Sequence, residues 1–169
     1  SQMKHELPDF FYGDAPPPQP GVGPTATRSN PYHGYLTRGL LTERGFNHVV
    51  DCIVAMKEVL GDEVGLALDC GPGWTLPDAI RLTKAVEGLH LMWLEDLLTG
   101  DYVPWVAADV YRELTRVSTT PIHTGEQIYL RHNFKELIET NAVNILGPDP
   151  ADIGGLAELK WVAEYADLH

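Results

Sequence analysis

Three short apolar runs of this chain each end in a carboxylate, and segments with helical spacing of apolar residues separate them. The runs are VGLALD, HLMWLE and TPIHTGE, which end at Asp69, Glu95 and Glu126. If the runs are successive parallel strands, their carboxyl ends meet at one edge of the sheet and bring the acids together. Carboxylate oxygens gathered in this way can hold one hard divalent cation, as Mg²⁺ requires. The pattern therefore predicts a parallel α/β fold with a metal site.

The remaining pattern alternates between helix and strand in units of about thirty residues, which favours a parallel sheet. Helical spacing predicts helices over 46–60, 77–86, 106–117 and 156–166, with Gly61 and Gly88 ending the first two. Asn133 with Glu136 resembles a capping box and predicts a further helix there. Extended segments are predicted over 64–69, 91–95, 121–126 and 143–146.

Both an open doubly wound sheet and a closed eightfold barrel satisfy this alternation. No GxGxxG motif follows the first clear strand, which argues against a dinucleotide-binding sheet. Acids at the end of strand after strand favour the barrel, whose active site draws on several strand ends. We therefore expect a partial TIM-type (β/α) barrel. The period-two rule for strands predicts the inward-facing positions, which are Ala67, Asp69, Trp93, Glu95, Thr124 and Glu126.

Composition excludes several function classes. The 169 residues carry a formal net charge of -12, which repels nucleic acid and anionic membrane. An anionic small molecule remains a possible partner if a bound metal supplies positive charge locally. The chain has two cysteines, Cys52 and Cys70, without CxxC spacing, and no apolar stretch approaches the roughly twenty residues that span a bilayer. These features predict a soluble, cytoplasmic protein.

Four motifs resemble consecutive barrel strands of the enolase superfamily, in its mandelate racemase and muconate lactonising branch. They are DCGPGW at 69–74, WLED at 93–96, PIHTGE at 121–126 and GPDPADIGG at 147–155, and the resemblance covers 35–169. It implies a Mg²⁺ ion held by Asp69, Glu95 and Glu126, which binds a substrate carboxylate and stabilises the enediolate left when a base removes the α-proton.

Each acid also has a simpler interpretation. Taken alone, Asp69 is typical of a turn, and Glu95 and Asp96 are typical of solvated loop acids. The joint occurrence at three successive strand ends favours the metal site.

The resemblance also implies acid–base groups. Asp149 corresponds to an aspartate that hydrogen-bonds a histidine on the following strand and raises its basicity; alone, it is typical of a turn or helix cap. The family's second base is usually a lysine at the end of the second strand, which Lys4 can provide. His5 and Tyr12 are alternatives, and Lys4 can equally be a solvated residue. We expect His169 to be a helix-end residue and not the catalytic histidine.

The Pro- and Gly-rich stretch at 13–34 lacks apolar periodicity and predicts a long loop. It resembles the extended second-strand loop of sugar-acid dehydratases in this superfamily. We therefore divide the chain into 1–34, a strand end with an active-site loop, and 35–169, the central (β/α) units.

The family's N-terminal capping domain and last strands are not found in the sequence, so we expect an internal fragment of a longer enzyme. The resemblance implies a Mg²⁺-dependent aldonate-type dehydratase acting on a small anionic sugar acid, with a homo-oligomeric parent enzyme. A racemase or epimerase of the same branch, or a catalytically inactive fragment, is the alternative.

Overall fold

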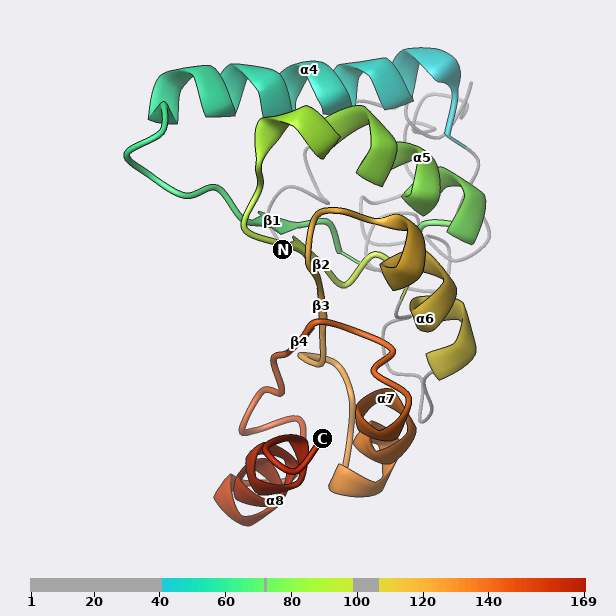
Figure 1. Cartoon of the computed structure of the whole chain (residues 1–169), viewed down its shortest axis with the longest axis vertical. Helices are drawn as coiled ribbons and strands as arrows, with labels where there is room; N and C mark the ends of the chain where they lie inside the picture. Colours follow the sequence, from blue (N-terminus) through green and yellow to red (C-terminus); the bar gives the residue numbers. More distant parts are fainter. Residues whose placement is uncertain (1–40, 72, 99–106) are drawn as a thin grey trace, which may run out of the picture.

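The computed structural model describes residues 41–71, 73–98 and 107–169. Over these residues helices and short strands alternate (Figure 1). The strands are β1 Leu68–Asp69, β2 Leu94–Glu95, β3 Ile122–Thr124 and β4 Ile145–Leu146. The helices are α4 Glu43–Leu60, α5 Leu76–Val86, α6 Ala108–Val117, α7 Lys135–Glu139 and α8 Leu156–Ala166. Short 3₁₀ helices cover Glu87–Leu89 and Arg131–Phe134.

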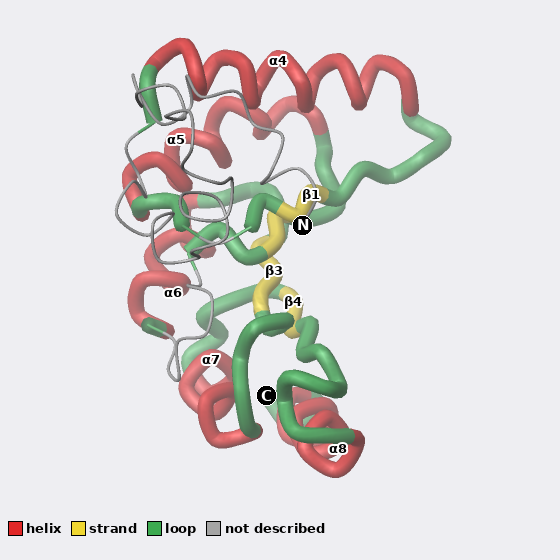
Figure 2. The backbone as a smooth tube through the Cα atoms, turned by 180° about the vertical axis from the view of Figure 1, so that it is seen from behind, coloured by secondary structure: helices red, strands yellow, loops and turns green. Residues whose placement is uncertain are grey.

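The four strands form one parallel sheet in the order β1-β2-β3-β4. Strands that follow each other in the chain are therefore neighbours in space, without the reversal of order that defines a doubly wound sheet. The helices follow one another in an arc from α4 to α8, with the strands on the inner side (Figures 1 and 2). This arrangement is a sector of a (β/α) barrel, and it confirms the predicted fold class.

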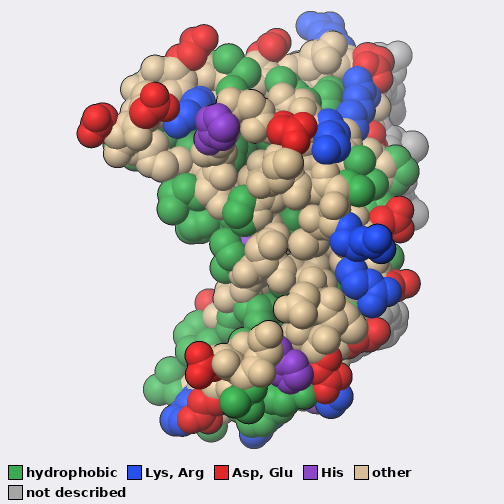
Figure 3. Space-filling model, in the orientation of Figure 1, with side chains coloured by type: hydrophobic (Ala, Val, Ile, Leu, Met, Phe, Trp, Pro, Cys, Tyr) green, Lys and Arg blue, Asp and Glu red, His purple; other side chains and the backbone are tan. Residues whose placement is uncertain are grey.

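The sheet has two distinct faces, because side chains alternate along each strand. Leu68, Leu94 and Ile122 pair in one row and are buried beneath the helices. Asp69 and Glu95 pair in the next row and are less buried than the first row. The space-filling view shows that the molecule is indented on one side, between α4 and α8 (Figure 3).

The predicted inward position of Thr124 is wrong. Thr124 is fully buried and its hydroxyl accepts a hydrogen bond from Tyr111 of α6, so it lies on the helix side of the sheet. The residue that pairs with Glu95 in the inward row is His123. Gly125 explains why Glu126 can still turn toward the other acids: its φ of 143° breaks the alternation after β3.

Local signals account for both ends of α4 and for the start of α5. The Thr42 hydroxyl caps α4 by accepting the N–H of Gly45 at 3.0 Å, and Thr75 caps α5 by accepting the N–H of Asp78. Gly61, with φ of 62°, ends α4 as predicted.

Two predicted helix signals are wrong. Asn133 is not an N-cap, because its side-chain amide donates to the Tyr129 carbonyl and α7 begins only after a 3₁₀ turn. Gly88 does not stop the chain's helical path, since it lies inside the 3₁₀ turn that extends α5 to Leu89. The predicted strands are also longer than β1, β2 and β4, whose regular pairing covers only their carboxyl ends.

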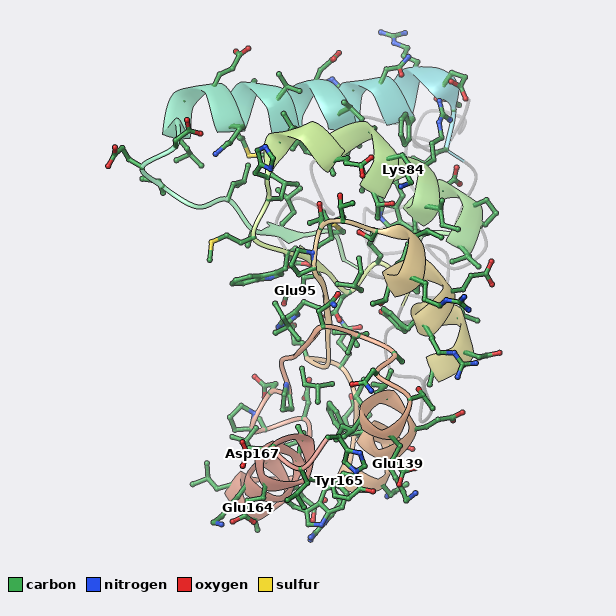
Figure 4. All side chains as sticks on the ribbon, viewed as in Figure 1. Lys84, Glu95, Glu139, Glu164, Tyr165 and Asp167 are labelled. Atoms are coloured by element: carbon green, nitrogen blue, oxygen red, sulfur yellow. The ribbon has the colours of Figure 1, made fainter. Side chains whose placement is uncertain are left out.

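Neighbouring helices are tied together across the outer layer. The Arg81 guanidinium of α5 makes two hydrogen bonds to the Glu43 carboxylate of α4, at 2.6 and 2.5 Å, and lies 3.8 Å above the centre of the Phe46 ring. Tyr165 of α8 donates to Glu139 of α7 at 2.5 Å (Figure 4). These contacts link neighbouring helices of the outer layer.

None of the helices in the described residues is long and apolar enough to cross a membrane. The candidates Lys4, His5 and Tyr12, the stretch 13–34 and the division at residue 34 lie outside the described residues.

Candidate metal centre

Carboxylates gather at the carboxyl edge of the sheet. Glu95 ends β2, Asp96 follows it, and Glu126 comes two residues after β3 (Figure 4 labels Glu95). Each of these three side chains offers an oxygen that lies within 4.8 Å of the others. The structure therefore brings together two of the three predicted metal ligands, and adds Asp96.

Asp69, the third predicted ligand, lies beside this cluster. It pairs with Glu95 in the strand register, and its Oδ1 accepts the backbone N–H of Gly71 at 2.8 Å. Its oxygens are outside the set within 4.8 Å, yet its charge acts on Glu126, as described next.

The electrostatics of the edge favour a cation. The pKa of the Glu126 carboxyl is raised, first by the hydration it loses and then by the negative charges of Asp96, Asp69, Glu95 and Asp149. The negative charges that raise the pKa of Glu126 also repel its ionised carboxylate, and an added positive charge would offset this repulsion. Clustered hard oxygen donors of this kind fit Mg²⁺.

Two stacked aromatic residues, Trp93 and His123, lie against the Glu95 carboxylate. The Trp93 indole N–H donates to Glu95 Oε2 at 3.0 Å, and His123 Nδ1 lies 3.6 Å from the same oxygen. The Trp93 and His123 rings stack with centroids 5.7 Å apart. His123 Nδ1 is buried and makes no hydrogen bond in the structure. His123 was not among the site residues predicted from the sequence. The register of β2 and β3, which pairs His123 with Glu95, identifies it.

Asp96 is not a solvated loop acid, since its residue is 2% exposed. Its Oδ1 accepts hydrogen bonds from the Thr124 hydroxyl at 2.6 Å and from the Gly125 N–H at 3.3 Å. Burial raises the pKa of the Asp96 carboxyl, and these two hydrogen bonds oppose that rise.

Asp149 follows β4 and has a turn role in the structure. Its Oδ1 accepts the N–H groups of Ala151 at 2.7 Å and Asp152 at 3.1 Å. Its charge nevertheless contributes to the raised pKa of Glu126, so it belongs to the same edge. His169 is exposed, follows α8 and lies with its ring 4.9 Å from that of Tyr165.

Gly147 offers a test of the support beneath Glu95. A Cβ on Gly147 would lie 2.1 Å from His123 Nε2, so Gly147→Ala must displace the imidazole that stacks on Trp93. We expect this variant, made in a complete barrel enzyme containing the segment, to weaken Mg²⁺ binding about tenfold by calorimetric titration. Gly88→Ala is the control, because its Cβ would meet nothing within 4 Å. Equal affinities in the two variants would contradict a supporting role for His123.

Parallel β/α units in sequential order, with carboxylates at their strand ends, define a (β/α)-barrel protein with an acidic site at the carboxyl edge. The family model described as enolase C-terminal domain-like matches residues 33–169. The chain therefore belongs to this family, which confirms the resemblance found in the sequence.

Several of the similar proteins are sugar-acid dehydratases. The chain is 35% identical to D-xylonate dehydratase of Haloferax volcanii, over 73% of this chain and 29% of that protein. A mandelate racemase/muconate lactonizing enzyme-like protein of Rubrobacter xylanophilus superposes with a TM-score of 0.70 at 35% identity, over 78% of this chain and 32% of that protein. L-Talarate dehydratase of Polaromonas sp., complexed with Mg and L-glucarate, superposes with a TM-score of 0.66 at 27% identity, over 72% of this chain and 31% of that protein. The chain thus spans less than a third of each protein.

Proposed function

We propose that these residues form the central part of a Mg²⁺-dependent sugar-acid dehydratase. The observation that carries the proposal is the cluster of Glu95, Asp96 and Glu126 oxygens within 4.8 Å at the carboxyl edge of the parallel sheet. The similarity to D-xylonate dehydratase supports the reaction class, and the neighbour complexed with Mg and L-glucarate supports the metal and an anionic sugar-acid substrate.

Asp69, Glu95 and Glu126 are the proposed ligands. They come from the ends of β1 and β2 and from the turn after β3, at the same edge of the sheet. The oxygens of Glu95 and Glu126 lie within 4.8 Å of each other, and Asp69 pairs with Glu95 in the strand register. Asp96 is less suited to the role, because it is buried and its Oδ1 already accepts two hydrogen bonds. Mg²⁺ bound here supplies the positive charge that attracts the substrate carboxylate and offsets the charge developed at the transition state.

The proposed reaction is removal of the proton α to the carboxylate, followed by loss of the β-hydroxyl. A base takes the α-proton, the C–H electron pair forms the carbon–carbon double bond, and the β C–O bond breaks. A general acid protonates the leaving oxygen, so that water and an enol form, and the enol becomes a 2-keto-3-deoxy acid. Lys4 or Tyr12 is proposed as one acid–base group, and Asp149 as the residue that orients a histidine on the following strand.

A product assay tests this class. We expect a complete barrel enzyme containing the segment, supplied with Mg²⁺ and a panel of aldonates and aldarates, to release one water per substrate and form a 2-keto-3-deoxy acid. The measurement is mass spectrometry with proton NMR in D₂O. Products epimerised at the α-carbon, or exchange of the α-proton without loss of water, would assign the site to a racemase or epimerase.

A further inference from the structure

A buried chain of hydrogen bonds runs from α6 to the acidic edge. The backbone N–H of Leu98 donates to the Tyr111 hydroxyl at 3.3 Å, and that hydroxyl donates to Thr124 Oγ1 at 3.1 Å. The Thr124 hydroxyl in turn donates to Asp96 Oδ1 at 2.6 Å. Each hydroxyl accepts from one side and donates to the other, so the direction of the chain leads to the Asp96 carboxylate.

Every side chain in this chain of hydrogen bonds is buried. The exposed fractions are 1% for Tyr111, 0% for Thr124 and 2% for Asp96. A buried carboxylate is an inefficient way to stabilise a fold, because apolar residues of similar volume often do as well or better. Asp96 also has φ of 51°, a left-handed conformation that is uncommon outside glycine. Backbone strain of this kind clusters at functional sites, where the surroundings hold it in place.

Asp96 is connected through the backbone to both Glu95 and Glu126. Glu95 precedes it in the chain, so the backbone conformation at Asp96 is set beside that ligand. The Gly125 N–H donates to Asp96 Oδ1 at 3.3 Å, and Gly125 directly precedes Glu126. The Asp96 carboxylate thus joins the turn after β2 to the turn after β3.

The turn after β3 is held from its other side as well. The Gly147 N–H after β4 donates to the Thr124 carbonyl at 3.0 Å. A Cβ on Gly125 would lie 2.9 Å from the Gly147 carbonyl carbon, which shows how closely the two backbones approach. The backbone that carries Glu126 therefore lies between the Asp96 carboxylate and the end of β4.

We propose that Asp96, Thr124 and Tyr111 are positioning residues that align the carboxylates of Glu95 and Glu126 for the divalent cation. This inference rests on the proposed function, since it presupposes that these carboxylates bind Mg²⁺. The three side chains are not proposed as ligands. They act on the cation only through the two turns that they join to α6. Outer groups of this kind commonly set metal affinity by orienting the ligands.

The test removes single hydroxyl groups in a complete barrel enzyme containing the segment. Thr124→Val keeps the side-chain shape and loses the bond to Asp96; Thr124→Ser retains the hydroxyl and serves as the rescue. We expect Thr124→Val to raise the Kd for Mg²⁺ at least about tenfold by calorimetric titration, with Thr124→Ser within about twofold of wild type. If Thr124→Val does not fold, Tyr111→Phe replaces it as the test variant, and we expect it to raise the Kd for Mg²⁺ about three- to tenfold.

A matched control separates positioning from general loosening. Thr115, also on α6, donates its hydroxyl to the Ala142 carbonyl at 2.7 Å, in the segment that leads into β4. Thr115→Val removes, by the same chemical change, one hydrogen bond between α6 and the segment before β4. We expect it to lower the thermal unfolding midpoint and to leave the Kd for Mg²⁺ unchanged.

The outcomes distinguish the two proposals. Wild-type Mg²⁺ affinity in Thr124→Val and Tyr111→Phe would overturn the positioning role alone, as would equal weakening in Thr115→Val. A wild-type enzyme that binds no Mg²⁺ would overturn the proposed function, and the positioning role with it.

Discussion

Replacing Glu126 by glutamine should abolish turnover in a complete barrel enzyme containing this segment and lower its Mg²⁺ affinity by at least about 100-fold, more than loss of a typical outer group. Glutamine offers one neutral amide oxygen where the carboxylate offers two charged ones. The fold should be nearly unchanged, because the Glu126 side chain is exposed and the turn that carries it is held by Gly125 and Thr124. Calorimetric titration, circular dichroism and the product assay measure the three effects.

Glu113→Gln is the matched control for this variant. Glu113 is an exposed residue of α6, so the same change in formal charge is made on the outer layer of the fold. We expect wild-type affinity and turnover there. Wild-type Mg²⁺ affinity in Glu126→Gln would rule out Glu126 as a ligand.

The fold could be predicted from the sequence because its signals are local and repeated. The glycine at the end of α4 and the apolar spacing of α4, α5 and α8 each act within a few residues of chain. The ends of β1 and β2 could be placed because the apolar run of each stops at an acid, Asp69 and Glu95. The strand β3 instead ends at Thr124, two residues before Glu126. The failed capping assignment at Asn133 has a tertiary cause, since its side chain bonds the Tyr129 carbonyl of the preceding turn instead.

The candidate site was only partly predictable for a related reason. The acids at strand ends are visible in the sequence, but the partner that each one acquires depends on register. The period-two rule, applied backward from Glu126, predicts that Thr124 faces inward. The backbone bends at Gly125, so the rule does not hold across it, and the residue that pairs with Glu95 is His123. Asp96 follows Glu95 directly, and its burial depends on contacts with Thr124, which lies 28 residues further along the chain.

A hollow beside β4 exposes apolar surface, which affects whether the 169-residue chain associates when it is produced alone. A volume of about 470 Å³ lies between α7, β4 and α8, and its walls include Val143, Leu146 and Val162. Within the described residues β1 and β4 each pair on one side only. Unpaired strand edges and open apolar surface favour association with other chains.

The isolated 169-residue chain should therefore show no measurable dehydration of sugar acids and should associate in solution. A closed barrel draws its site from several strand ends, and the described sector provides the acidic part of the edge. The proposed histidine partner of Asp149 belongs to a strand beyond β4, and losing such an acid–base group commonly lowers the rate by about 10² to 10⁴. Light scattering and the product assay with Mg²⁺ test both expectations. A monomeric chain that unfolds cooperatively and releases 2-keto-3-deoxy acid at ordinary enzymatic rates would show that this sector forms a sufficient active site by itself.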